Sequence, residues 1–223
     1  MGVATAMAIL ADKNVVHPPL EVLITVDEET GMYGAFDLKP GMLQGKTLIN
    51  LDSEEEGELY IGCAGGVDGT FTFGYVPEEV PEGDIAVKVS VKGCKGGHSG
   101  CDIKLQRANA NKLLFRFLKE AVKEYEARLA GVNGGSLRNA IPREAEAIIT
   151  IPQEGLEDLR EFVDEIEDLF IKEYNGIEDS ISVTMEEVAR PAGLIPEEIQ
   201  DNMLINNFVP SESFELEYLS LRG

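Results

Sequence analysis

Residues 23–35, LITVDEETGMYGA, decide how this chain is expected to fold, because an apolar run changes there into three acids and then glycines. The β-branched run at 21–26 predicts a buried strand, since buried parallel strands are continuous apolar segments. Open α/β sheets bind ligands at the carboxyl ends of their strands, which is where Asp27, Glu28 and Glu29 fall. Three adjacent carboxylates repel one another unless a cation is shared between them. The stretch therefore predicts either a metal site or a solvated acidic turn.

A second apolar run, at 47–51, also ends in an acid, Asp52. Two neighbouring strands are thus expected to bring carboxylates to one edge of a sheet. The segment 2–12 is apolar nearly all round, which predicts a helix buried on most sides. Composition changes at Gly65-Gly66, so we expect residues 1–65 to form an α/β unit that ends there.

Residues 66–207 predict a second domain of a different class. Its expected elements, in order, are strands at 70–75 and 85–92, a helix at 105–125, two short strands within 126–151 around a turn at 133–135, a helix at 155–174 and a strand at 181–188. From 85 onward the order is β-α-β-β-α-β, the ferredoxin-like α+β arrangement with helices on one face of an antiparallel sheet. Residues 208–223 are a tail that periodicity does not assign.

Bulk properties exclude several classes of protein. A net charge of −22 argues against binding to nucleic acid or to anionic membranes, both of which require a basic surface. No apolar run approaches the length of a membrane span. The cysteines number three and contain no CxxC pair, so they predict no disulfide framework and indicate a reducing, cytoplasmic compartment. Each is expected to be a buried structural thiol.

Five ordered motifs resemble the M20 metallopeptidases: TVDEETGM at 25–32, NLDSEE at 50–55, GHSG at 97–100, RANA at 107–110 and SLRNAIP at 136–142. The residues in these motifs are similar to those of the aminoacyl-histidine dipeptidase (peptidase D, or bacterial carnosinase) branch, and the resemblance covers about residues 1–205. The resemblance implies a hydrolase with two zinc ions, Mn²⁺ or Co²⁺ being possible substitutes. It also implies an α/β catalytic domain, to which residues 1–65 belong, and a lid domain over 66–207 that forms a homodimer.

The same resemblance implies roles for the acids of the first unit. Glu28 would be the general base that takes a proton from a metal-bound water. Glu29 would ligate one zinc ion and Asp52 the other. Asp27 would support the bend or a neighbouring ligand.

In the lid, the resemblance implies that His98 reaches into the partner subunit's active site, where it polarises the scissile carbonyl or stabilises the oxyanion. Arg138 and Asn139 would contact the substrate, again across the dimer. Without the resemblance, His98 is a loop histidine in a glycine-rich turn, and Arg138 and Asn139 are polar residues before a strand.

The chain departs from the family in its histidines. His17 and His98 are its two histidines, and neither lies in the His-x-Asp motif or the C-terminal ligand position that the family uses. We therefore expect an incomplete, inactive central portion of a cytoplasmic zinc dipeptidase that hydrolyses Xaa-His dipeptides. The alternatives are a non-catalytic lid-type dimerisation module, and an M20 amino-acid deacylase or other exo-metallopeptidase.

Overall fold

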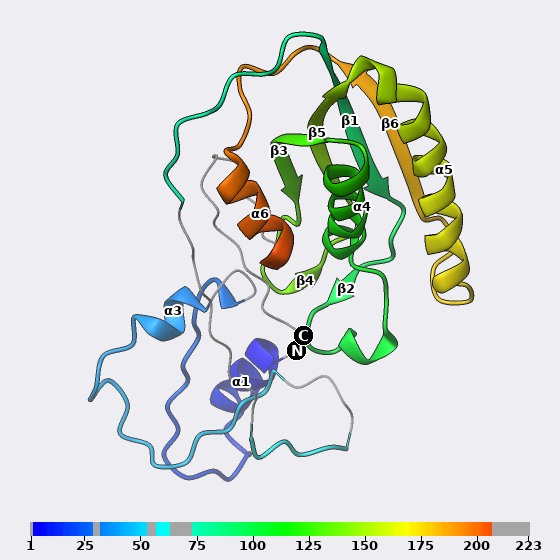
Figure 1. Cartoon of the computed structure of the whole chain (residues 1–223). Coiled ribbons are helices and arrows are strands. Elements are labelled where there is room, and N and C mark those ends of the chain that lie inside the picture. The colour runs from blue at the N-terminus through cyan, green and yellow to red at the C-terminus, as the bar shows by residue number, and fades with distance from the viewer. Residues whose placement is uncertain (1, 29–31, 53–56, 63–72, 207–223) are drawn as a thin grey trace. The chain divides into compact units, whose positions relative to one another are not determined.

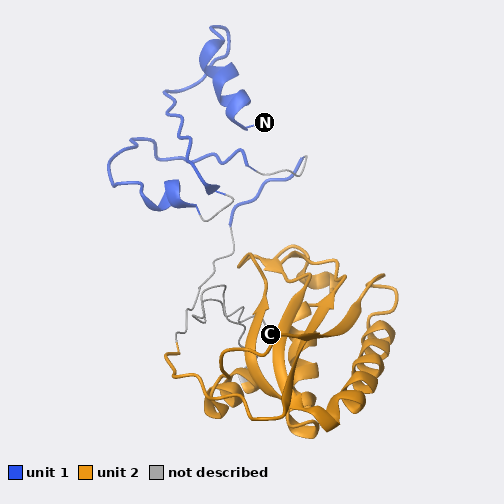
Figure 2. Cartoon of the chain, turned by 90° about the horizontal axis from the view of Figure 1, so that it is seen from above, with its two compact units in different colours: residues 1–65 blue, residues 66–223 orange. Residues whose placement is uncertain are grey.

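The computed structural model describes residues 2–28, 32–52, 57–62 and 73–206 (Figure 1). The chain divides into two compact units, residues 1–65 and residues 66–223 (Figure 2). Each unit has its own architecture, and each is described separately below. No helix formed by the described residues combines the length and the apolarity that a membrane crossing requires.

The second unit is built on a four-stranded antiparallel sheet with the strand order β3-β5-β1-β6. Its strands are β1 (Asp84–Lys92), β3 (Arg128–Gly134), β5 (Ala145–Pro152) and β6 (Ser182–Val188). On the central strand β1, alternate valines are fully buried: Val87, Val89 and Val91. This period of two is the pattern of a strand with one face on the core. The ferredoxin-like arrangement predicted from the sequence is confirmed.

Helices α4 (Ala110–Glu124), α5 (Leu156–Glu173) and α6 (Glu197–Asn206) cover one face of this sheet (Figure 1). The core lies between the helices and the sheet. The largest side chains that α4 contributes to it are each at most 1% exposed: Leu113, Leu114, Phe115, Phe117 and Leu118. Helix α4 begins after Asn109, whose side chain accepts a hydrogen bond from the Lys112 N–H at 3.2 Å, as expected of a helix cap.

The predicted start of this helix at 105 is wrong by five residues. Residues Ile103–Leu105 form a separate 3₁₀ turn, and Gln106 follows it with a left-handed φ of 54°. A left-handed residue ends the turn, so the regular helix can begin only after Asn109, whose backbone is extended. A further 3₁₀ turn, Gln153–Gly155, precedes α5.

The connection between β3 and β5 is longer than the predicted turn at 133–135. Strand β3 continues through Gly134, and the chain then forms the short strand β4 (Ala140–Ile141) before β5 begins. Strand β4 pairs antiparallel with β2 (Gly97–His98), a second sheet separate from the first. This small ribbon carries the histidine that the sequence singled out.

The described part of the first unit contains α1 (Gly2–Ala11) and the short helix α3 (Tyr33–Phe36), and most of its other described residues are irregular. The strands predicted at 21–26 and 47–51 are absent there, and none of the α1 residues is buried. A strand exists only where a neighbouring strand takes its hydrogen bonds, and neither segment is paired with any strand of the described residues. Ile24 and Leu48 are accordingly 61% and 81% exposed.

Two further predictions concern segments that lie partly or wholly outside the described residues. In the strand predicted at 70–75, residues 73–75 are irregular and the others lie outside the described residues. The tail at 208–223 also lies outside them.

Candidate functional site

The acids of the first unit that the structure describes, Asp27, Glu28 and Asp52, are all exposed. Asp27 has a left-handed φ of 55°, and its carbonyl and that of Glu28 accept the Met32 N–H at 2.8 and 3.1 Å. The acids therefore begin a hydrogen-bonded turn and do not end a paired strand. Asp52 is exposed as well, and its N–H donates to Asn50 Oδ1 at 3.1 Å. Glu29 lies outside the described residues.

The described residues do not bring together a metal site. Among them, no group of three or more histidine, cysteine, aspartate or glutamate side chains is close enough to hold a metal ion. Catalytic zinc is held by about three protein ligands, and histidine or cysteine is normally among them. Exposed Asp52 does not meet that requirement by itself, so the described residues do not form a catalytic zinc site.

In the second unit, glycines shape the backbone on which His98 sits. Gly96 and Gly97 have φ values of 64° and 148°, a region that side chains with a Cβ rarely adopt. A Cβ on Gly97 would lie 2.5 Å from Asp102 Oδ2 and 2.6 Å from the Arg107 guanidinium. The loop can therefore close on these two side chains only because position 97 has none.

The His98 ring is exposed and is held by its own loop. Its Nδ1 accepts hydrogen bonds from the N–H groups of Gly100 at 3.0 Å and Cys101 at 3.2 Å. The other ring nitrogen, Nε2, has no hydrogen-bond partner among the described residues. The loop thus uses one nitrogen for its own structure and leaves the other available to a ligand.

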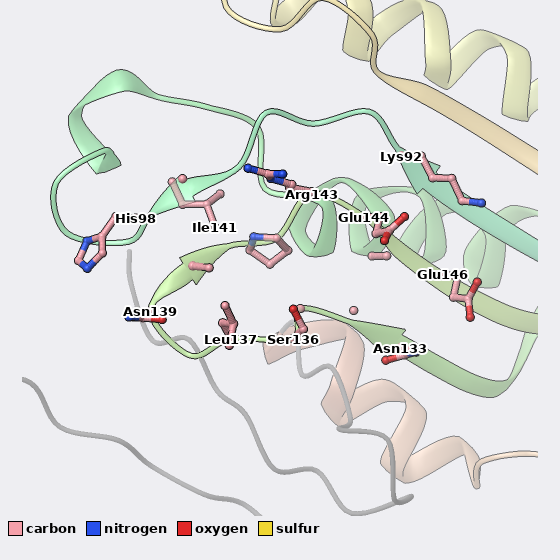
Figure 3. A pocket seen from close by; sticks show the side chains of 16 residues that line it. Lys92, His98, Asn133, Ser136, Leu137, Asn139, Ile141, Arg143, Glu144 and Glu146 are labelled. Carbon is pink, nitrogen blue, oxygen red and sulfur yellow. The ribbon is translucent and has the colours of Figure 1, made fainter. Parts of the chain in front are cut away.

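The β2–β4 ribbon brings His98 beside Asn139. His98 pairs with Ala140, and the Ser99 N–H donates to the Asn139 carbonyl at 2.8 Å. Both His98 and Asn139 line one open groove with a volume of about 1410 Å³. Figure 3 shows these two residues at one end of the groove and Lys92 at the other.

The other predicted lid residue, Arg138, is exposed but is not among the residues that line this groove. The structure therefore brings together two of the three lid residues that the sequence predicted, His98 and Asn139. Arg143, Glu144 and Glu146 also line the groove, and the sequence reasoning assigned no role to them. Their position directly after the SLRNAIP motif was the available signal.

A buried carboxylate anchors the base of the His98 loop. Glu178 Oε2 accepts the Lys95 N–H at 2.7 Å, and Oε1 accepts the Ala108 N–H at 2.9 Å, at the two ends of the loop. Burial, with a smaller contribution from Glu178, raises the pKa of the nearby Cys94 thiol to about 11. Cys94 is buried as predicted, whereas Cys101 is exposed, against the prediction. Cys63 lies outside the described residues.

Comparison with known proteins now identifies the second unit. The peptidase dimerisation domain of the M20 family matches residues 89–178, which run from β1 to the Glu178 anchor. The second unit is therefore similar to an M20 peptidase dimerisation domain. The match contains three of the five motifs, GHSG, RANA and SLRNAIP, and confirms the predicted resemblance there.

Two relatives extend the similarity beyond the dimerisation domain. The cytosol non-specific dipeptidase of Escherichia coli (strain K12) is 45% identical over 204 residues, which cover 92% of this chain and 42% of that protein. The crystal structure of aminoacylhistidine dipeptidase from Vibrio alginolyticus is 46% identical in sequence and matches with a TM-score of 0.73. This match also covers 92% of the present chain and 42% of the relative. The chain thus spans less than half the length of these M20 relatives.

Proposed function

We propose that this chain is the central portion of a cytoplasmic M20 dipeptidase, and that the whole protein hydrolyses Xaa-His dipeptides in a zinc-dependent reaction. The observation that carries the proposal is the joint placement of His98 and Asn139 on one groove of a domain whose relatives are dipeptidases. The aminoacylhistidine dipeptidase similarity favours substrates with a C-terminal histidine.

His98 is proposed to act as a hydrogen-bond donor. Its exposed Nε2 would donate to the carbonyl oxygen of the scissile peptide bond, where negative charge develops as water attacks. Asn139, beside it on the groove, would bind a polar end of the dipeptide through its side-chain amide. Arg138 is proposed as a further contact to the substrate, outside the groove itself.

Glu28 is proposed as the general base that accepts a proton from the attacking water. Glu29 and Asp52 are proposed as two ligands of the zinc site, with Mn²⁺ or Co²⁺ as possible substitutes. The described residues do not complete that site, so the remaining ligands would have to come from outside them. For the same reason, we propose that the chain by itself is inactive.

The second candidate function is that of a dimerisation module without chemistry of its own. It is favoured by the same lack of a metal site among the described residues and by the match to a peptidase dimerisation domain. In both cases we propose a homodimer formed through residues 66–207. Sedimentation equilibrium of the chain would give twice its mass of 24.3 kDa if this is correct.

Zinc titration calorimetry and dipeptide hydrolysis assays distinguish the two candidates. The chain alone is expected to show no tight two-site zinc binding and no hydrolysis of β-alanyl-histidine. In a protein restored to the full length of its relatives, hydrolysis should appear, and Glu28→Ala should abolish it while the metal content stays near that of the parent. A nanomolar two-site isotherm on the chain alone would contradict the proposed incompleteness. Loss of both metal ions in Glu28→Ala would show that Glu28 is a ligand.

A further inference from the structure

We propose that the loop of residues 96–102 locks His98 in the Nε2–H tautomer, and that Asp102 and Arg107 are positioning residues that maintain this lock. The catalytic meaning of the lock rests on the proposed function. The lock itself is a property of this chain and can be measured without any enzymatic activity.

The first step concerns the ring nitrogen that faces the loop. The backbone N–H groups of Gly100 and Cys101 both donate to His98 Nδ1. A backbone N–H has no lone pair, so Nδ1 must offer its own lone pair and carry no proton. In the neutral imidazole the proton is then on Nε2. Two donors on one nitrogen favour this tautomer over an imidazole that exchanges freely between both.

The second step concerns what keeps those two N–H groups in place. The His98 N–H donates to Asp102 Oδ2 at 2.8 Å, and the Asp102 N–H donates back to the His98 carbonyl at 3.0 Å. This reciprocal pair closes the backbone into a tight turn around Gly100 and Cys101. The Asp102 side chain is 31% exposed, so its hydrogen bond is partly shielded from water.

Arg107 holds the other side of the turn. Its guanidinium donates to the Gly96 carbonyl at 2.6 Å and lies 3.5 Å from Asp102 Oδ2. The Arg107 side chain is 27% exposed and therefore mostly packed against the loop. One arginine thus joins the residue before the ribbon to the carboxylate that follows it, and the absent Cβ of Gly97 leaves the space for this contact.

The consequence for chemistry is a division of roles between the two ring nitrogens. With Nδ1 engaged by the loop, His98 can present only an N–H donor to a substrate, as electrostatic stabilisation of a carbonyl oxygen requires. In its neutral form the ring does not expose a lone pair at Nε2, so it does not act there as a general base. That role is left to a carboxylate, in agreement with the proposal for Glu28.

The chain contains its own contrast in the second histidine. His17 Nδ1 lies 2.7 Å from the Pro18 carbonyl oxygen. A carbonyl oxygen only accepts, so His17 must carry its proton on Nδ1 when this contact is made. The two histidines of the chain are therefore expected in opposite tautomers, which makes each an internal reference for the other.

The test is nitrogen-15 NMR of the full chain with ¹⁵N-labelled histidine, at a pH of about 8.5, where ordinary imidazoles are neutral. His17→Gln assigns the signals. We expect the His98 Nδ1 shift at the limit of an unprotonated nitrogen, distinct from the averaged shift of the same chain in urea. Asp102→Ala should move it toward that averaged value, and Asp102→Asn, which keeps an oxygen acceptor, should restore most of the difference.

Glu173→Ala is the matched control, because it removes a carboxylate on α5 that pairs with Arg116 on α4 at 2.8 Å, outside the loop of residues 96–102. It should leave the His98 signal unchanged. Arg107→Ala offers a second route to the same result if Asp102→Ala fails to fold, as judged by circular dichroism. A His98 Nδ1 that carries a proton, or an averaged shift in the folded parent chain, would overturn the proposal. So would an unchanged shift in folded Asp102→Ala and Arg107→Ala.

Discussion

Replacing Glu178 by alanine should destabilise the second unit more than the same replacement of an exposed acid. The substitution leaves two N–H groups without their acceptor: that of Ala108, which is buried, and that of Lys95, which is partly buried. An unsatisfied buried donor costs about 1–3 kcal/mol, and partial hydration at Lys95 lowers the second contribution. We therefore expect a loss of about 2–4 kcal/mol in the free energy of unfolding. For a domain of this size that corresponds to a fall in Tm of roughly 5–15 °C.

Urea unfolding followed by far-ultraviolet circular dichroism measures this loss, provided that the m-value is unchanged. Glu178→Gln keeps one oxygen acceptor and should fall between the parent and the alanine variant. Asp179→Ala is the matched control, because its side chain is 75% exposed and its ion pair with Lys95 is a surface contact. Such pairs contribute about 1 kcal/mol or less. Equal stabilities for Glu178→Ala and Asp179→Ala would refute the reasoning.

Three further predictions concern single residues. Gly97→Ala should destabilise the loop by about 1–3 kcal/mol, because the φ of 148° at this position is unfavourable for alanine and the added Cβ would lie 2.5 Å from Asp102 Oδ2. Chemical denaturation measures the loss, and an unchanged stability would contradict this reasoning. Iodoacetamide at pH 8 should alkylate exposed Cys101, while Cys94, with its pKa raised to about 11, should react only after unfolding; mass spectrometry would expose the reverse order. Phe117→Ala should cost about 3–5 kcal/mol, since Phe117 is fully buried, and a loss below about 1 kcal/mol in urea titration would show that the core collapses around the deleted ring.

The second unit could be predicted closely because its information is local. The period of two in β1 and the apolar face of α4 specify element type and orientation within a single segment. Helix α5, expected at 155–174, runs from Leu156 to Glu173. At the start of α4, where the prediction failed by five residues, a single backbone conformation decided the outcome: left-handed Gln106 delays the helix, and no propensity of glutamine indicates this.

The first unit was predicted less well because a strand is not a local property. The segments that contain Ile24 and Leu48 have the composition of buried strands. A strand also needs hydrogen-bonded neighbouring strands and a layer that covers it, and both must come from elsewhere in the fold. The described residues supply neither, so the same side chains stay exposed. An apolar run indicates that burial is favourable, but it does not identify the surface that would cover it.

The candidate site shows a similar division. The GHSG motif singled out His98, and in the structure His98 and Asn139 line the same groove. Glu178, by contrast, belongs to none of the motifs and lies 80 positions after His98 in the sequence. Its contacts with Lys95 and Ala108 depend on a long-range closure that no spacing rule reveals. Long-range anchors of this kind require the structure.

The ribbon that carries His98 has a consequence for how the domain can open. Its ladder consists of two residue pairs, Gly97 with Ile141 and His98 with Ala140, and it belongs to a different sheet from β1 and β5. Short peripheral elements of this kind open with a much smaller free energy than global unfolding, as separate cooperative units. Amide hydrogens in the ribbon can therefore exchange with solvent while the four-stranded sheet stays protected. Mutations that tighten or loosen the presentation of the histidine are thus expected to change amide exchange in the ribbon more than in the core that supports it.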